Sequence, residues 1–390
     1  MKRLKIAVLF GGCSTEYPVS LQSAYSVITN LDPARYDPVL LGITREGDWK
    51  KYSGPPEAII QDKWNQPQYC VPAFLTPSRS LHGFVSFRDG LSTTEKIDVA
   101  FPVLHGKNGE DGTLQGLLSM AGIPCVGCGV LSSALCMDKD AAHRLVQLAG
   151  ISVPRSVALT KELPKAELLK AVEVLHFPLF IKPVKSGSSF GITKADKPDM
   201  LFDAVHSAFQ FDNKVLIEEA VDGFEVGCAV LGNDALTVGE VDEIELSHGF
   251  FDYTEKYTLK TSKIHMPARI DAETASRIKK TAQIIYLALD CSGFARVDMF
   301  LTPDRKIVFN EVNTIPGFTS HSRYPSMMKG IGMDFKQIID QLIRLAIENE
   351  NRQSAPAGYR KRKSDSGKSL SPDALRTKRK RPQIRTAGLL

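Results

Sequence analysis

Three oxygen-bearing side chains in the C-terminal third of the chain have the types and spacing of a divalent metal site. Asp298 lies in one largely apolar segment, and Glu311 and Asn313 stand two residues apart in the next. Residues i and i+2 of a β-strand point to the same face, so Glu311 and Asn313 share one face. If the two segments pair across the turn at Pro303, Asp298 joins them. Two carboxylates and an amide oxygen then form a hard oxygen site, which suits Mg²⁺ bound to nucleotide phosphates.

An exposed polar face is the alternative explanation of this pattern. It is disfavoured because the segment 307–313 is otherwise largely apolar. Arg296 precedes Asp298 by two residues and therefore shares its face. A guanidinium group at this place could stabilise a developing oxyanion or a phosphoryl group during its transfer.

Two polar loops elsewhere in the chain add weaker signals. Lys182 ends an apolar segment just before 185–191, where Gly and Ser residues would let backbone N–H groups close over a triphosphate. Taken alone, such a loop is more often only a turn. The glycine-rich loop 105–112 begins with His105 and follows another apolar segment, and α/β domains bind their ligands at such strand ends.

The elements that must position these residues alternate between short β-branched runs and longer helical patterns, which predicts an α/β architecture. Buried parallel strands are expected at 5–10, 38–43 and 98–104, with helices at 20–31, 113–121 and 139–149. Strands at 215–220, 226–231 and 236–241 have the spacing of an antiparallel meander. Further strands are expected at 179–183, 296–301 and 306–313, and outer helices at 272–289 and 334–350.

The chain has 390 residues, 43% of them hydrophobic and 24% charged, which excludes a wholly disordered, collagen-like or coiled-coil protein. This length suggests two or three domains. Seven scattered cysteines indicate buried thiols in a reducing compartment. Cys125 and Cys128 have the spacing of a metal or redox pair, but without a matching second pair core packing is favoured. The apolar run 6–10 is too short for a signal peptide, and no segment has the length of a membrane span, so a cytoplasmic protein is expected.

The charge of the chain is divided unevenly. Residues 352–390 carry 12 Lys or Arg against 2 Asp or Glu, a balance of +10, which leaves −5 for the rest of a chain whose net charge is +5. The segment 351–390 is poor in large apolar residues and is expected to be a disordered basic tail. A solvated tail is favoured over a nucleic-acid or lipid patch at 377–382. A protein that binds nucleic acid through this tail is the alternative function of a different class. Because a solvated tail is favoured, no nucleic-acid partner is expected.

The polar motifs occur together and in one order, and in this combination the chain resembles the D-alanine–D-alanine ligases of the ATP-grasp superfamily over about residues 4 to 348. Closest in character are the vancomycin-resistance-type ligases, especially those that make D-alanyl-D-serine. The motifs that carry the resemblance are Phe10-Gly-Gly-x-Ser14-x-Glu16, His105-Gly106 with Gly109-Glu-Asp-Gly112, Met137-Asp-Lys139, Lys182-Pro with Gly187-Ser-Ser189, Glu218 with Glu225, Arg296-x-Asp298 and Asn310-Glu-x-Asn313-Thr-x-Pro-Gly317.

The resemblance implies an ATP-grasp fold with three domains. These are an N-terminal Rossmann-like parallel-sheet domain (1–138), a central α+β ATP-binding domain (139–225) and a C-terminal α+β domain (226–350) with a lid loop at 247–262. It also implies ATP, two Mg²⁺ (or Mn²⁺), D-alanine, a second D-amino acid and a homodimer. The residues matching the family's nucleotide site are Lys139, Lys182, Glu218, Glu225, Lys256 and Asn310, and those matching its metal ligands are Asp298, Glu311 and Asn313.

The resemblance further implies a reaction in which the first D-alanine is phosphorylated on its carboxylate and the second substrate's amine then attacks. Glu16 would hold the first ammonium group, and Arg296 with the N–H of Gly317 would stabilise the oxyanion. His105 would lie near the first substrate, Ser322 and Arg323 near the second. The lid's Tyr257 would contact Glu16 and Ser188 around the second-substrate site.

Two positions bear on the second substrate. Members that add D-alanine carry an apolar residue where this chain has Arg323, whereas resistance-type ligases carry Arg. Members that add D-lactate lose the lid Tyr or have His in the lid, whereas this chain keeps Lys256 and Tyr257. The resemblance therefore favours D-serine, with a housekeeping D-alanine–D-alanine ligase as the alternative. An arginine donor to a substrate hydroxyl would discriminate by about 1–3 kcal/mol.

Overall fold

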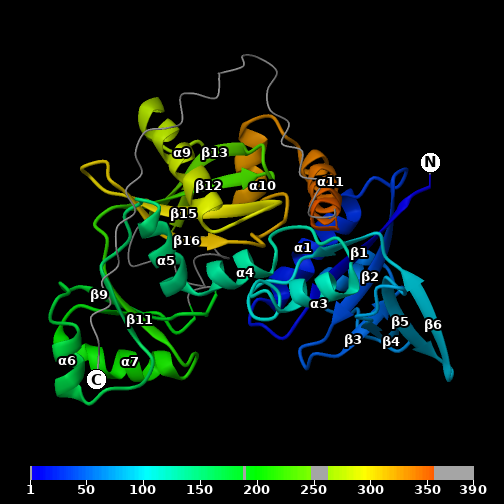
Figure 1. Cartoon of the computed structure of the whole chain (residues 1–390), viewed down its shortest axis with the longest axis horizontal. Coiled ribbons are helices and arrows are strands. Elements are labelled where there is room, and N and C mark those ends of the chain that lie inside the picture. The colour runs from blue at the N-terminus through cyan, green and yellow to red at the C-terminus, as the bar shows by residue number, and fades with distance from the viewer. Residues whose placement is uncertain (1, 188–189, 247–261, 355–390) are drawn as a thin grey trace, which may run out of the picture. The chain divides into compact units, whose positions relative to one another are not determined.

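The computed structural model describes residues 2–187, 190–246 and 262–354 (Figure 1). The predicted lid at 247–262 falls almost wholly outside this description, as does the predicted tail from residue 355 onward. The described residues form three separate β-sheets, each built from a different part of the sequence. No helix within the described ranges is long and apolar enough to cross a membrane.

The first sheet has seven strands in the order β6-β5-β4-β3-β2-β1-β7. Its parallel part is β1 (Leu4–Gly11), β2 (Tyr36–Ile43) and β7 (Val99–Pro102), as predicted. Helices α1 (Tyr17–Asn30), α2 (Pro56–Ile60), α3 (Thr113–Ala121) and α4 (Val130–Met137) accompany it. Four antiparallel strands that the sequence analysis missed extend it, namely β3 (Trp49–Tyr52), β4 (Cys70–Leu75), β5 (Gly83–Arg88) and β6 (Leu91–Lys96).

The second sheet has four strands in the order β10-β9-β11-β8. They are β8 (Ser156–Leu159), β9 (Leu179–Pro183), β10 (Thr193–Ala195) and β11 (Val215–Glu219), with α6 (Lys165–Ala171), η1 (Pro198–Met200) and α7 (Leu201–Phe209). The predicted meander is wrong at its first strand. β11 pairs with β8 and β9, because the chain leaves this sheet after Glu219 and enters the next one at Phe224.

The third sheet is antiparallel throughout and has the order β14-β13-β12-β15-β16. Its strands are β12 (Phe224–Leu231), β13 (Thr237–Leu246), β14 (Ser262–His265), β15 (Phe294–Leu301) and β16 (Ile307–Asn313). Alternate residues of β12 enter two different cores. Val226, Cys228 and Val230 pack with α9 (Ala272–Ala288), whereas Ala229 and Leu231 pack in the core that includes α10 (Arg323–Gly330) and α11 (Phe335–Ser354).

Helix α11 continues to Ser354, four residues beyond the predicted end, so the predicted tail begins inside a helix. The core on the α10 side is continuous with that of the first sheet, where it includes Phe10, Phe101 and residues of α1. Tyr324 of α10 lies edge-to-face against Phe294 of β15, with ring centroids 5.3 Å apart. Shared packing of this kind fixes the loops of the first sheet against those of the third.

Candidate active site

Two adjoining cavities lie where the polar motifs meet. The first, of about 500 Å³, is bounded by the second and third sheets. The second, of about 330 Å³, is bounded by the loops after β1, β7 and β16. Lys139, Ser186 and Glu311 line both cavities, so a ligand in one meets a ligand in the other at these three residues.

The first cavity combines an apolar slot with charged ends. Phe180, Ile192, Phe224 and Phe300 provide apolar walls, and Lys182 and Glu218 lie among them as a buried ion pair. Lys139 opens α5 (Lys139–Leu148), whose N-terminus is capped by Asp138, and donates from Nζ to the carbonyl of Ser186 at 2.9 Å. A cavity with apolar walls and two lysine ammonium groups suits a nucleotide, whose base is apolar and whose phosphates are anionic.

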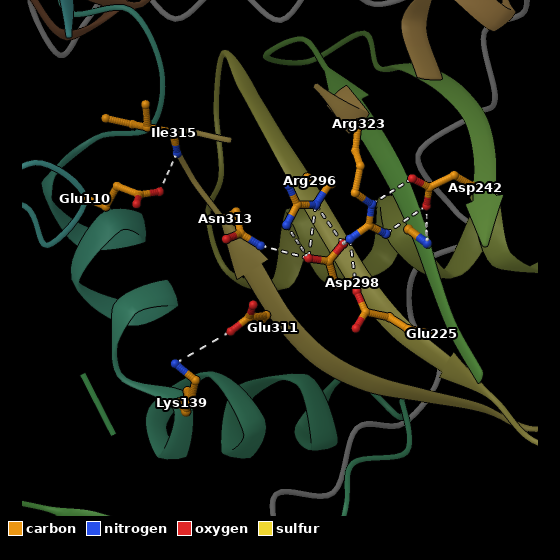
Figure 2. A network of polar contacts seen from close by, with 11 residues as sticks. Glu110, Lys139, Glu225, Asp242, Arg296, Asp298, Glu311, Asn313, Ile315 and Arg323 are labelled. Atoms are coloured by element: carbon orange, nitrogen blue, oxygen red, sulfur yellow. Dashed lines mark hydrogen bonds and ion pairs between the residues drawn. The ribbon is translucent and has the colours of Figure 1, made fainter. Parts of the chain in front are cut away.

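The predicted oxygen cluster is assembled by the pairing of β15 with β16, which places Asp298 opposite Glu311 and Arg296 opposite Asn313 (Figure 2). Asn313 Nδ2 donates to Asp298 Oδ2 at 2.9 Å. Glu311 Oε2 lies 3.6 Å from Lys139 Nζ. The predicted strand pairing across the turn at Pro303 is therefore confirmed.

Asp298 is held between two guanidinium groups. Arg296 donates from Nε to Oδ1 at 2.8 Å and from Nη2 to Oδ2 at 2.7 Å, and Arg323 Nη1 lies 3.5 Å from Oδ1. Burial alone would raise the pKa of Asp298, but the positive charges of Arg296 and Arg323 outweigh it and hold the pKa below its usual range. Asp298 is thus a buried anion with its charge balanced on two sides.

Arg323 itself is anchored by two further carboxylates. Its Nε and Nη2 form a forked contact with Asp242 of β13, at 2.7 and 2.8 Å, and its Nη1 donates to Glu225 of β12 at 3.0 Å. This packing requires glycine at position 227, because a Cβ there would lie 2.3 Å from Nη2 of Arg323. Asp242 was not among the predicted site residues, because β13 carries four acidic residues and no local pattern distinguishes Asp242 from the other three.

The second cavity places Glu16 between two glycines. Built Cβ atoms at Gly106 and Gly187 would each lie 2.7 Å from Glu16 Oε2, so no larger residue fits at either position without a shift. Ser14 ties the loop together, since its hydroxyl donates to the carbonyl of His105 at 2.6 Å and accepts from the N–H of Glu16 at 3.1 Å. The Glu16 carboxylate therefore lies in the wall of the second cavity, between the loops that carry Gly106 and Gly187.

His105 and Glu110 connect this region to the loop after β16. His105 Nδ1 lies 2.8 Å from the carbonyl oxygen of Ile315, and burial lowers the pKa of its imidazole. Glu110 accepts from the N–H of Gly106 and from the N–H of Ile315, each at 2.8 Å. Burial, and then the negative charge of Glu16, raises the pKa of Glu110 to about 8, whereas the two N–H donors favour its ionised form. Glu110 was not among the predicted site residues, although it lies within the His105–Gly112 motif.

The other predicted residues fall as follows. Gly317, Ser322, Arg296 and Arg323 line the second cavity. Asn310 and Glu225 line the first, where the Asn310 carbonyl also contacts His143 Nε2 at 2.9 Å. Asp298 lines neither cavity and supports Asn313 from behind. Ser188, Lys256 and Tyr257 lie outside the described residues.

The donor set fits magnesium bound to a nucleotide rather than a cage made of protein alone. Among the residues that the structure describes, no group of three or more His, Cys, Asp or Glu could hold a metal ion. Two carboxylates and the Asn313 amide oxygen leave several positions of an octahedral ion to phosphate oxygens and water, which is the usual arrangement for Mg²⁺. Glu311 and Asn313 face the cavities and would be the residues that reach such an ion.

Family models of the D-ala D-ala ligase N-terminus and C-terminus match residues 5–128 and 145–344. A D-alanine–D-alanine ligase of Caldicellulosiruptor bescii is 46% identical over 93% of this chain and all of its own length. The vancomycin B-type resistance protein VanB of Enterococcus faecalis is 47% identical over 89% of this chain and all of its own length. A crystal structure of the VanG D-Ala:D-Ser ligase from Enterococcus faecalis is 59% identical, with a TM-score of 0.82, over 88% of this chain and all of that one.

Proposed function

The chain belongs to the D-alanine–D-alanine ligase family of ATP-dependent ligases, and from that premise we propose that it joins D-alanine to D-serine through a D-alanyl phosphate intermediate. The product would supply peptidoglycan synthesis and confer vancomycin resistance. The observation that carries the proposal is the common wall of the two cavities, where Lys139, Ser186 and Glu311 face a ligand on either side. Phosphoryl transfer between two bound substrates requires such a junction.

In the proposed first step, ATP occupies the first cavity and D-alanine the second. Lys139 and Lys182 bind the phosphates, and Glu218 and Glu225 bind the adenine and ribose end. Glu16 holds the ammonium group of D-alanine, so that its carboxylate is presented to the γ-phosphate. Attack forms the acyl phosphate and releases ADP. Glu311 and Asn313 would hold Mg²⁺ at this junction, with Asp298 as the third predicted ligand behind Asn313, and the ion would neutralise charge on the phosphates.

In the proposed second step, the amine of the second substrate attacks the acyl carbonyl and phosphate leaves. Arg296 and the N–H of Gly317 stabilise the tetrahedral oxyanion, because both line the second cavity and both are donors. Ser322 would contact the second substrate, and Lys256 would bind the nucleotide. Tyr257 would contact Glu16 and Ser188 around the second-substrate site. His105, held by Ile315, shapes the first-substrate site.

The preference for D-serine is supported by the VanG ligase, which is 59% identical to this chain, and by Arg323 in the wall of the second cavity. The contacts of Arg323 limit which of its N–H groups could bind a substrate. Its Nε–H and one N–H on each terminal nitrogen already donate to Asp242 or Glu225. Only the N–H groups that these contacts leave over could donate to a substrate hydroxyl, directly or through water.

Formation of D-alanyl-D-alanine is the second candidate, because a relative of that name is 46% identical over nearly the whole chain. Phosphate release tests both candidates with the purified protein, ATP, Mg²⁺ and D-alanine, with D-serine or D-lactate added separately. Product partition with equal D-serine and D-alanine then assigns the second substrate. We expect D-alanyl-D-serine to dominate. If D-alanyl-D-alanine is the main product, the D-serine assignment is wrong, but the assignment to the ligase class stands. If no mixture yields ADP, the proposed reaction itself is wrong.

The same proposal includes the domain boundaries 1–138, 139–225 and 226–350, a homodimer, and the cytoplasm as the place of action, where ATP is available. Limited proteolysis would test the boundaries, and light scattering of the full chain would test the dimer. Neither measurement depends on the choice of second substrate.

A further inference from the structure

Among the described residues that line the second cavity, Glu110 is the one acidic side chain to which the proposed reaction gives no role, and its contacts are unusual in kind. Each of its two carboxylate oxygens accepts a backbone N–H, and the two N–H groups belong to different loops. Figure 2 shows the contact with Ile315. Gly106 lies in the loop after β7, and Ile315 lies in the loop after β16, 205 residues away from Glu110 in sequence.

Both loops carry groups of the proposed reaction. Gly106 faces the Glu16 carboxylate so closely that a Cβ would lie 2.7 Å from Oε2. Ile315 is two residues before Gly317, whose N–H is proposed for the oxyanion. A second link runs in parallel, because His105 Nδ1 contacts the Ile315 carbonyl at 2.8 Å. The ammonium end and the oxyanion end of the second cavity are thus joined through Gly106, Glu110 and Ile315.

We propose that Glu110 is a positioning residue that fixes the Gly106 loop relative to the Ile315 loop. Glu16 and the Gly317 N–H can then contact the same bound D-alanine. The expected effect of Glu110 on turnover rests on the proposed function. The link between the loops stands on the two hydrogen bonds alone. Oxyanion donors act only when they are already placed where charge develops, so a shift of one loop lowers turnover more than it lowers binding of the nucleotide.

Glu110→Gln tests this link with almost no change of volume. Both partners of Glu110 are N–H donors, so the amide NH₂ group of glutamine must face one of them whichever way it is turned. Asp111→Asn is the matched control, because Asp111 accepts the N–H groups of Asn108 and Thr113 within its own loop. Glu110→Asp is a second variant that keeps the carboxyl group but is too short to reach both loops.

For Glu110→Gln we expect a fall in kcat of about ten- to a hundredfold, with the Kd for ADP within twofold of wild type. Hydrogen–deuterium exchange should rise in peptides covering 105–112 and 313–318 and nowhere else. Glu110→Asp should share both effects, and Asp111→Asn should raise exchange in 105–113 only, with kcat kept.

Unchanged exchange at 313–318 in Glu110→Gln would overturn the link, as would an equal loss of ADP binding, since that result means general loss of structure. If wild type forms no dipeptide, the proposed function fails, but the exchange pattern still decides whether Glu110 joins the loops. Faster exchange with unchanged kcat would overturn the positioning role while leaving the contact in place.

Discussion

Two clusters in this protein place one carboxylate between two cationic side chains, and they differ chiefly in burial. In the third sheet, Asp298 lies between Arg296 and Arg323, and the three side chains are 2%, 12% and 8% exposed. In the first sheet, Glu95 of β6 lies between Lys5 and Lys51, at 2.8 and 2.6 Å, with side chains 20%, 36% and 30% exposed. The contact of Arg296 with Asp298, at 2.7 Å, is as short as the two lysine contacts of Glu95, whereas Arg323 lies farther from Asp298, at 3.5 Å.

The difference lies in what replaces a lost partner. Water solvates any of the three charges at the edge of the first sheet, and Lys side chains rearrange easily, so an exposed pair contributes little. In the third sheet, water is largely excluded, and the guanidinium groups are fixed by forked contacts with Asp298 and Asp242. Removal of one member there leaves a buried charge without compensation, which costs far more than the intact network contributes. The buried cluster is therefore expected to be rigid and sensitive.

The largest effect is expected for Asp298→Asn. Two buried guanidinium groups lose their shared carboxylate, so the free energy of unfolding should fall by about 3–5 kcal/mol. Urea denaturation measures the loss, and phosphate release should be abolished as well. Asp304→Asn is the control, because Asp304 lies in the exposed turn of the same β15–β16 hairpin. A loss below about 1 kcal/mol would show that the two clusters do not differ as burial predicts.

Glu311→Gln should separate activity from stability within the same cluster. The Glu311 side chain is 22% exposed, opens on both cavities and lies 3.6 Å from Lys139 Nζ, so the fold depends less on its charge. We expect a loss of at least about a hundredfold in kcat, because the charge that orients the γ-phosphate is removed. The melting temperature should stay within a few degrees of wild type. Near-normal turnover would refute the metal assignment of Glu311.

Arg323→Met should shift the second substrate from D-serine toward D-alanine by about ten- to a hundredfold in relative kcat/KM. The apolar side chain would leave the serine hydroxyl without a donor. It would also remove the cation that faces the buried Asp242, so the single variant should lose stability too. Product partition in equal D-serine and D-alanine measures the first effect.

The double variant Arg323→Met/Asp242→Asn distinguishes these two consequences. It removes the uncompensated carboxylate of Asp242 together with the guanidinium, and part of the stability should return. A partition that returns with the stability would mean that Arg323 acts only through the fold. An unmoved partition in both variants would contradict the D-serine assignment.

The parts of this architecture that could be predicted from the sequence are those with a strong local signal. The apolar runs of β1, β2 and β7 and the period-2 spacing of Glu311 and Asn313 predicted strands and a shared face, and the structure confirms both. β6 was missed because its sequence, LSTTEK, has no apolar alternation and is nearly all exposed. Its pairing with β5 comes from the hairpin, which no local pattern of that segment encodes.

Contacts between distant segments were the other limit. The fork of Arg323 onto Asp242 joins positions 81 residues apart, and nothing near either residue indicates the other. Arg323 was therefore interpreted only through its effect on a substrate, whereas the structure adds a role among carboxylates. Glu110 was not predicted as a site residue for the same reason, since one of its two hydrogen bonds joins it to Ile315, which is distant in sequence. Local motifs predict which side chains can do chemistry, but the supporting contacts depend on the tertiary fold.

The smallest effect is expected for Glu95→Gln. Burial alone would raise the pKa of Glu95, but its hydrogen bonds and ion pairs with Lys5 and Lys51 outweigh it and lower the pKa below the ordinary 4.5. The carboxylate is then more readily ionised in the folded state than in the unfolded chain. Its contribution to stability is therefore present above pH 4.5 and is lost as the pH falls through the folded-state pKa. For pairs this exposed, the contribution at pH 7 should be about 0.2–1 kcal/mol.

Urea denaturation of wild type and Glu95→Gln at pH 7 and at pH 3 measures this contribution, and the difference between the two proteins should be smaller at pH 3 than at pH 7. At pH 7 it should also shrink in 1 M NaCl, where the screening length is about 3 Å. The effect of Asp298→Asn should change little with salt, because its partners are enclosed by protein. If the two differences respond equally to salt, burial is not what separates the clusters. The geometry of the cations, planar guanidinium against flexible ammonium, would then have to explain the contrast.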